Sequence, residues 1–134
     1  MSIVGDTAEV ERVISANVTL TEAKIDDPVA LINAFSVPVE EDELFLERWK
    51  DNARAMSDQP GFVRARMFRS LVDDAEIRFV NVAEWATGAA LDAARENPEW
   101  RATIYRILDD PNLHVTARPV VYRAEIEVGP GDKL

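Results

Sequence analysis

The segment 29–37, VALINAFSV, is apolar at both odd and even positions and lies between Pro28 and Pro38. A short apolar run that is bounded by prolines is typical of a β-strand with both faces covered. The sequence therefore predicts a first core strand over residues 29–37.

From Glu40 to Met56 the apolar residues recur every three or four positions, with charged residues between them. These apolar positions are Phe45, Trp49, Ala53 and Met56. This spacing predicts an amphipathic helix. Its acidic first turn, residues 40–43, suits the positive end of the helix dipole, and Gln59-Pro60-Gly61 ends it.

The next two segments, 62–70 and 76–85, have strand composition, and Asp73-Asp74 between them is typical of a turn. They predict a hairpin. Thr87 is a suitable N-cap for a helix over residues 88–96, and Asn97-Pro98 starts a further helix with proline at its first position.

In that last helix one face is apolar, formed by Trp100, Ile104, Ile107 and Leu108. A final strand is expected over residues 115–128, and Pro119 within it favours a sheet edge or a bulge.

The order strand, helix, strand, strand, helix, strand predicts an α+β domain with a ferredoxin-like βαββαβ fold and helices on one face of an antiparallel sheet. We expect this domain to cover residues 28–128, with an extension at 1–27 and a tail at 129–134. The segment 13–23 could add an edge strand or an arm across a dimer.

The helices can cover only one face of this sheet, yet both strand faces are apolar. The residues pointing away from Leu31 and Phe79 are Ile32 and Ala34 in one strand and Val80 and Val82 in another. We therefore expect a homodimer that packs through the sheet faces.

The charge and composition of the chain limit the kinds of partner that it can bind. The formal net charge is −10, which repels nucleic acid, and no apolar run is long enough to span a membrane. The chain has no cysteine, and residues 1–13 lack the pattern of a secretory signal, so we expect a cytoplasmic protein without disulfides.

The sequence contains few of the residues and motifs that are typical of catalytic sites. His114 is the single histidine, and a lone histidine beside a loop is most often a surface or capping residue. There is no glycine-rich nucleotide loop and no zinc motif, so we expect neither a cofactor nor a metal.

Polar residues within apolar strands are the better candidates. Asn33 lies in LINAF and Asn81 in FVNVA, and Asn81 shares a strand face with Trp85, separated by the small Ala83. Either these side chains line a hollow, or each asparagine bonds a backbone bulge and Trp85 closes the core. Core packing is the expectation for Trp49 and Trp100.

Three segments in order resemble the antibiotic biosynthesis monooxygenase domains of the dimeric α/β-barrel superfamily. They are residues 31–35 (LINAF), 59–62 (QPGF) and 79–85 (FVNVAEW). In members that oxidise anthrone-like polyketides without a cofactor, the resemblance places Asn33, Asn81 and Trp85 in the pocket. It implies that the two amides bind an oxyanion able to react with dioxygen, while Trp85 positions a flat aromatic ring.

The chain also departs from these relatives. Val82 and Leu91 stand where the anthrone oxygenases carry tyrosines, and Ala94 and Ile104 stand where haem-degrading relatives carry a tryptophan and a histidine. The resemblance thus favours a monooxygenase acting on a small aromatic compound over haem degradation. A non-catalytic ligand-binding or stress-related barrel is the alternative.

Overall fold

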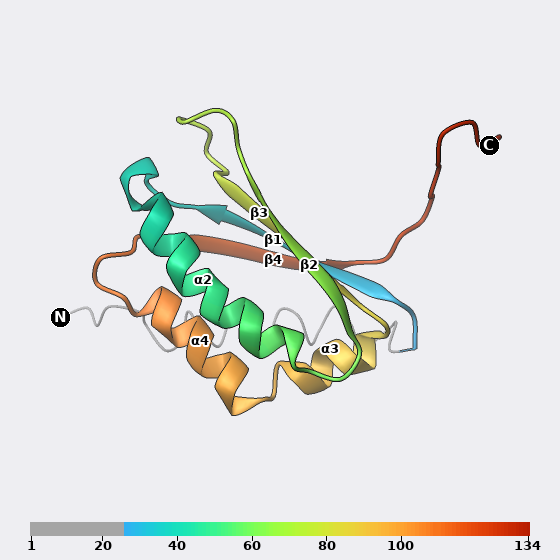
Figure 1. Ribbon diagram of the computed structural model, residues 1–134, viewed down its shortest axis with the longest axis horizontal. Helices are drawn as coiled ribbons and strands as arrows, with labels where there is room; N and C mark the ends of the chain where they lie inside the picture. Colours follow the sequence, from blue (N-terminus) through green and yellow to red (C-terminus); the bar gives the residue numbers. More distant parts are fainter. Residues whose placement is uncertain (1–25) are drawn as a thin grey trace.

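The computed structural model describes residues 26–134, so the expected extra strand within residues 13–23 lies outside the described part (Figure 1). Its elements, in chain order, are β1 (Val29–Ser36), the 3-10 turn η2 (Val39–Glu41), α2 (Asp42–Ser57), β2 (Phe62–Arg69), β3 (Phe79–Trp85), α3 (Gly88–Ala94), α4 (Pro98–Leu108) and β4 (Thr116–Tyr122). The predicted order of strands and helices is confirmed. The third strand begins at Phe79 rather than at Glu76.

The four strands form one antiparallel sheet in the order β2-β3-β1-β4. Pro119 lies in β4, an edge strand, as the sequence predicts, because an edge tolerates a residue without an N–H donor. The prediction that this strand runs to residue 128 is wrong. Tyr122 pairs with Ala30, and β1 begins only one residue earlier, after Pro28, so the chain beyond Tyr122 has almost no strand left to pair with.

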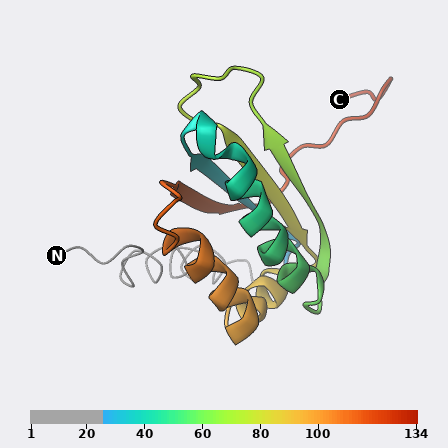
Figure 2. The same cartoon turned by 60° about the vertical axis from the view of Figure 1, so that its left-hand side comes forward.

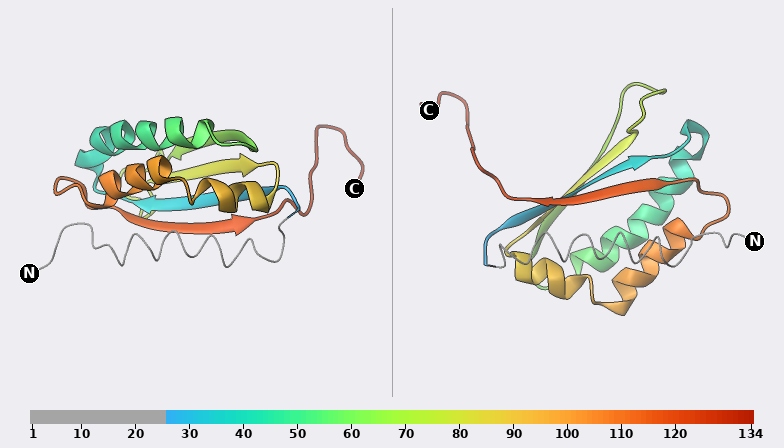
Figure 3. Two further views of the ribbon diagram at one scale, coloured as in Figure 1. Left: turned by 90° about the horizontal axis from the view of Figure 1, so that it is seen from below. Right: turned by 180° about the vertical axis from the view of Figure 1, so that it is seen from behind.

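All the described helices pack on one face of the sheet, which makes a two-layer domain (Figures 2 and 3). The buried apolar side chains between the layers form two clusters. One surrounds Trp85, Leu91 and Trp100, and the other surrounds Phe45 and Phe79. Within residues 26–134, none of the helices has both the length and the apolar character needed to cross a membrane.

Helix starts follow the predicted capping. The Thr87 hydroxyl accepts a hydrogen bond from the Ala90 N–H at 3.0 Å, and the side-chain Oδ1 of Asn97 accepts from the N–H groups of Glu99 and Trp100. Pro98 is the first residue of α4. These contacts satisfy N–H groups that have no partner within the helix.

The start of α2 carries a buried ion pair that the sequence does not reveal. Asp42 Oδ2 lies 2.7 Å from Arg78 Nη2, and the two side chains are only 11% and 3% exposed. Arg78 also donates to the carbonyl oxygens of Ser70 and Val72. The pair therefore ties α2 to the loop between β2 and β3.

The turn between α2 and β2 depends on Gly61. Its φ is +84°, a conformation that side chains with a Cβ rarely adopt, and a Cβ added there would lie 2.4 Å from the Ala90 Cβ. The Gln59-Pro60-Gly61 segment thus allows α3 to approach the turn closely.

Candidate functional site

Asn33 in β1 and Asn81 in β3 are direct partners in the register of the two central strands. Asn81 pairs on its other side with Met67, and Asn33 with Pro119. Asn81 is 4% exposed. The antiparallel fold thus brings together two amides that lie 48 residues apart in the sequence, because adjacent strand partners have Cβ atoms only about 5 Å apart.

A cavity of about 50 Å³ lies between this asparagine pair and the helices α2 and α4. Apolar side chains dominate its lining, which consists of Leu31, Asn33, Phe35, Trp49, Asn52, Met56, Asn81, Trp100, Ile104, Ile107, Leu108 and Ala117. This volume holds a few water molecules and is far below the roughly 300 Å³ of pockets for larger ligands. An aromatic ligand therefore requires the side chains of the wall to move apart.

The carbonyl oxygens of both asparagine side chains are buried without a hydrogen-bond partner among the described residues. No hydrogen bond from either side chain to a described backbone group is present, so the interpretation in which each asparagine bonds a backbone bulge is not supported. A buried unpaired amide costs about 1–3 kcal/mol. The fold keeps two of them side by side at one cavity.

Either end of these amides can meet a ligand. Rotation of the terminal amide exchanges its carbonyl oxygen, an acceptor, with its NH₂ group, which has two donors. Without a protein partner to fix that rotation, Asn33 and Asn81 can direct N–H groups at an anionic oxygen in the cavity.

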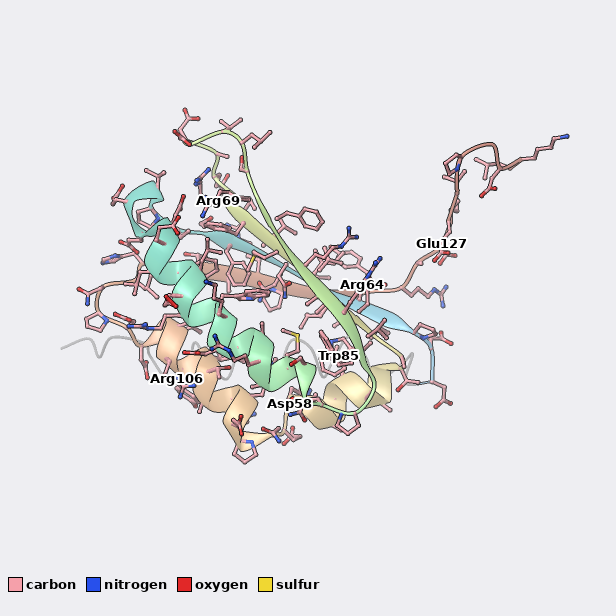
Figure 4. All side chains as sticks on the ribbon, in the orientation of Figure 1. Asp58, Arg64, Arg69, Trp85, Arg106 and Glu127 are labelled. Carbon is pink, nitrogen blue, oxygen red and sulfur yellow. The ribbon has the colours of Figure 1, made fainter. Side chains whose placement is uncertain are left out.

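Trp85 lies on the same face of β3 as Asn81, as the sequence predicts, but it does not line the cavity. Four residues along a strand separate the two by about 13 Å. The Trp85 ring packs edge-on against Phe62 at a centroid distance of 5.4 Å, and its Nε1 is buried without a described partner. Figure 4 shows Trp85 toward the α3 end of the sheet.

Trp100 and Trp49 contribute more to the cavity than the sequence suggests. Trp100 is 4% exposed in the core, as predicted, and it also lines the cavity with an Nε1 that lacks a described partner. The prediction of simple core packing for Trp49 is wrong. That side chain is half-buried and borders both the cavity and an outer groove beside Glu47 and Arg69, because α2 lies at the edge of its layer.

Asn52 also lines the cavity, although it was not among the residues predicted from the sequence. It is 8% exposed, lines the cavity from α2, and donates from Nδ2 to the Thr103 hydroxyl at 2.9 Å. The signal was its position seven residues after Phe45 and four before Met56, which is on the buried face of the helix.

Among residues 26–134, none that lines the cavity is titratable. His114 is exposed at the surface, where its Nδ1 lies 2.7 Å from Glu41 Oε2, in agreement with its expected surface role. Within the described part of the chain no three histidine, aspartate or glutamate side chains are grouped in a way that could hold a metal ion. The chemistry that this cavity offers is hydrogen bonding inside an apolar wall.

Residues 28–106 match the sequence model of the family described as antibiotic biosynthesis monooxygenase. The chain belongs to this family. The match covers β1 to β3 and most of α4 but not β4, and it confirms the family that the three sequence segments indicate. Comparison with curated protein sequences gives no significant match.

Solved structures of the antibiotic biosynthesis monooxygenase fold superpose on this chain. SnoaB, a cofactor-independent oxygenase from Streptomyces nogalater, is 27% identical with a TM-score of 0.60, over 76% of this chain and 97% of that one. The haem-degrading protein MhuD from Mycobacterium tuberculosis is 25% identical with a TM-score of 0.56, over 75% and 99%. A candidate monooxygenase from Shewanella loihica PV-4 is 29% identical with a TM-score of 0.59, over 75% and 97%. The ferredoxin-like fold is thus shared with both oxygenases and a haem degrader.

Proposed function

We propose that this protein is a cofactor-independent monooxygenase that acts on a small aromatic compound of the anthrone or quinol type. The observation that carries the proposal is the pair of unpartnered amides, Asn33 and Asn81, at one apolar cavity. The likeness to SnoaB, which is described as a cofactor-independent oxygenase, supports the same class.

The chemistry follows from what two amide donors can do. An anthrone loses a proton from its methylene carbon, and the negative charge spreads to the carbonyl oxygen on the opposite side of the central ring. Donors from Asn33 and Asn81 stabilise that oxyanion in a site from which water is largely excluded. The electron-rich anion then reacts with dioxygen. The methylene becomes a carbonyl with one oxygen atom, and the other oxygen leaves as water, so the substrate supplies all the electrons.

The substrate must supply its own acidity, because none of the described residues that line the cavity is titratable. Proton loss to water is feasible for a carbon or phenol acid whose anion is delocalised and hydrogen-bonded. The proposal therefore needs no general base from Val82 or Leu91, the positions where the resemblance expects tyrosines, and neither residue lines the cavity.

In this proposal the tryptophans help to position the aromatic ring of the substrate and take no part in the proton transfer. Trp100 offers an aromatic wall to the cavity, and its buried Nε1–H has no partner among the described residues. Trp85 lies behind this wall in the same buried cluster as Met56 and Trp100. We assign Trp85 the role of positioning these residues and of contacting the ring when a ligand widens the cavity.

Haem degradation is not supported by the residues of this cavity. MhuD is described with haems bound in its active site. In this chain the lining has no histidine, thiolate or phenolate that could bind iron, and Ile104 lines the cavity at the position where the resemblance expects a histidine.

A homodimer is part of the proposal. Apolar side chains remain half-exposed on the sheet face that no described helix covers, among them Ile32, Ala34, Val80 and Val82. Packing this face on a second copy would remove it from water. A 15 kDa species in sedimentation at micromolar concentration would contradict it.

Oxygen uptake with anthrone tests the function. We expect wild-type protein to consume dioxygen in equal amounts with the anthrone that becomes anthraquinone. Asn81→Ala is expected to lose at least about a hundredfold in rate, the typical effect of removing one oxyanion donor. Trp85→Phe keeps an aromatic side chain at this position, so its rate of oxygen uptake should fall less than that of Asn81→Ala. Tight binding of anthrone without oxygen uptake would favour the non-catalytic binding protein instead.

A further inference from the structure

Asn52 faces the asparagine pair from the opposite wall of the cavity. It comes from α2, whereas Asn33 and Asn81 come from the sheet, and all three line the same space. It is the only polar side chain that α2 or α4 contributes to the lining, apart from the indoles of Trp49 and Trp100. The cavity therefore has a polar group on each of its two layers.

The hydrogen bonds of Asn52 fix which of its atoms remains available. The Thr103 hydroxyl lies 2.6 Å from the Trp100 carbonyl oxygen and donates its single hydrogen there. Thr103 Oγ1 can then only accept, so the group 2.9 Å away must be the NH₂ of Asn52. This bond uses one N–H of Nδ2 and fixes the orientation of the amide, so Oδ1 is the acceptor that Asn52 can offer to a ligand, beside its second N–H.

The two walls thus differ in kind. Asn33 and Asn81 have no described partner and can rotate to present donors, whereas Thr103 fixes the Asn52 amide in one orientation, so that its Oδ1 stays in place as an acceptor. Thr103 is itself 2% exposed, so this lock lies inside the core and is shielded from competing water.

We propose that Asn52 is a specificity residue that accepts a hydrogen bond from a hydroxyl group on the substrate. This hydroxyl lies on the edge of the ring system away from the oxygen that the sheet amides bind. The inference rests on the proposed function and deepens it. The preferred substrate class becomes a flat aromatic with oxygen atoms on two opposite edges, one carrying the anion and the other a free O–H.

A matched pair of ligands tests the donor requirement without turnover. The probes are 1,5-dihydroxynaphthalene and 5-methoxy-1-naphthol, which share one hydroxyl, while the second oxygen donates only in the diol. Binding is measured without oxygen, by quenching of tryptophan fluorescence. We expect wild-type protein to prefer the diol about tenfold, the effect of one hydrogen bond to a buried partner.

Two variants connect this preference to Asn52 and its lock. Thr103→Val removes the lock while keeping the side-chain shape, and Asn52→Leu removes the acceptor. Both should reduce the preference to less than about threefold. Thr103→Ser keeps the hydroxyl and should retain the wild-type preference, which controls for changes in folding.

Equal binding of the two probes by wild-type protein would overturn the role of Asn52 and leave the pocket and its oxygenase function standing. The same holds if Asn52→Leu and Thr103→Val keep a tenfold preference. Failure of wild-type protein to bind either probe would overturn the pocket and the proposed function together.

Discussion

Asn33 and Asn81 stand side by side on β1 and β3, and the side-chain oxygen of each is buried without a described partner. A fold optimised for stability alone would place apolar residues there, because an unsatisfied buried amide is destabilising. This cost to stability supports the proposal that the pair binds a ligand.

Replacing either asparagine by leucine should separate stability from function. We expect Asn33→Leu and Asn81→Leu each to raise the free energy of unfolding by about 1 kcal/mol, because an unpaired amide is replaced by an apolar side chain beside a cavity with room for it. Oxygen uptake should fall at the same time. Urea denaturation measures the first effect, with Asn97→Leu as a control that removes a helix cap and should destabilise. Destabilisation of both strand variants by more than 1 kcal/mol would show that the amides are satisfied.

The rate of oxygen uptake should rise with pH along the ionisation of the substrate, not of the protein. The described residues that line the cavity include no titratable side chain, so we expect the reactive anion to form from the bound compound itself. Two anthrones that differ in acidity should give profiles displaced by the difference in their own pKa values. One common profile for both would indicate a protein base.

The buried pair between Asp42 and Arg78 should contribute far more to stability than the exposed pair between the neighbouring α2 residue Glu43 and Arg69 of β2. Arg78→Ala leaves a carboxylate that is 11% exposed without its partner, and we expect a loss of about 3–5 kcal/mol in urea denaturation. The control is Arg69→Ala, whose partner Glu43 is 85% exposed and whose removal should cost less than about 1 kcal/mol. Similar losses in the two variants would contradict this assignment.

Gly61 should not accept a side chain. Gly61→Ala combines a φ of +84° with a contact of 2.4 Å to the Ala90 Cβ, and we expect it to destabilise the fold by about 1–3 kcal/mol. The double variant with Ala90→Gly removes the contact but not the strain in φ. A positive coupling energy in this double-mutant cycle measures the contact, and strict additivity would show that it is relieved elsewhere.

The fold could be predicted from sequence because each element carries its own local signal. Prolines on both sides indicate β1, the spacing of apolar residues indicates α2, and Asn97-Pro98 indicates the start of α4. The end of β4 could not be predicted in this way. Residues after Tyr122 continue to alternate as in a strand, but whether a strand forms depends on where its partner β1 begins.

The site could be predicted only in part, because some of its residues carry a local sequence signal and others depend on contacts between distant segments. Asn33 and Asn81 stand out as polar residues in apolar strands, and the ferredoxin-like order then makes them neighbours. Trp85 shares their face but does not line the cavity, because it lies about 13 Å along the strand from Asn81. The spacing of Asn52 from Phe45 and Met56 places it on the buried face of α2, but its partner Thr103, 51 residues away, could be known only from the structure.

The central claim is that the two sheet amides stabilise an anion in the cavity, and the pKa of a bound phenol measures this most directly. Absorbance titration of 1-naphthol, free and bound without oxygen, gives both values. If donors from Asn33 and Asn81 favour the naphtholate, the pKa of the bound phenol falls by about one unit or more, and the shift disappears in the double variant Asn33→Leu, Asn81→Leu. Burial in an apolar cavity alone would raise the pKa, so an unchanged or raised value in wild-type protein would contradict the account.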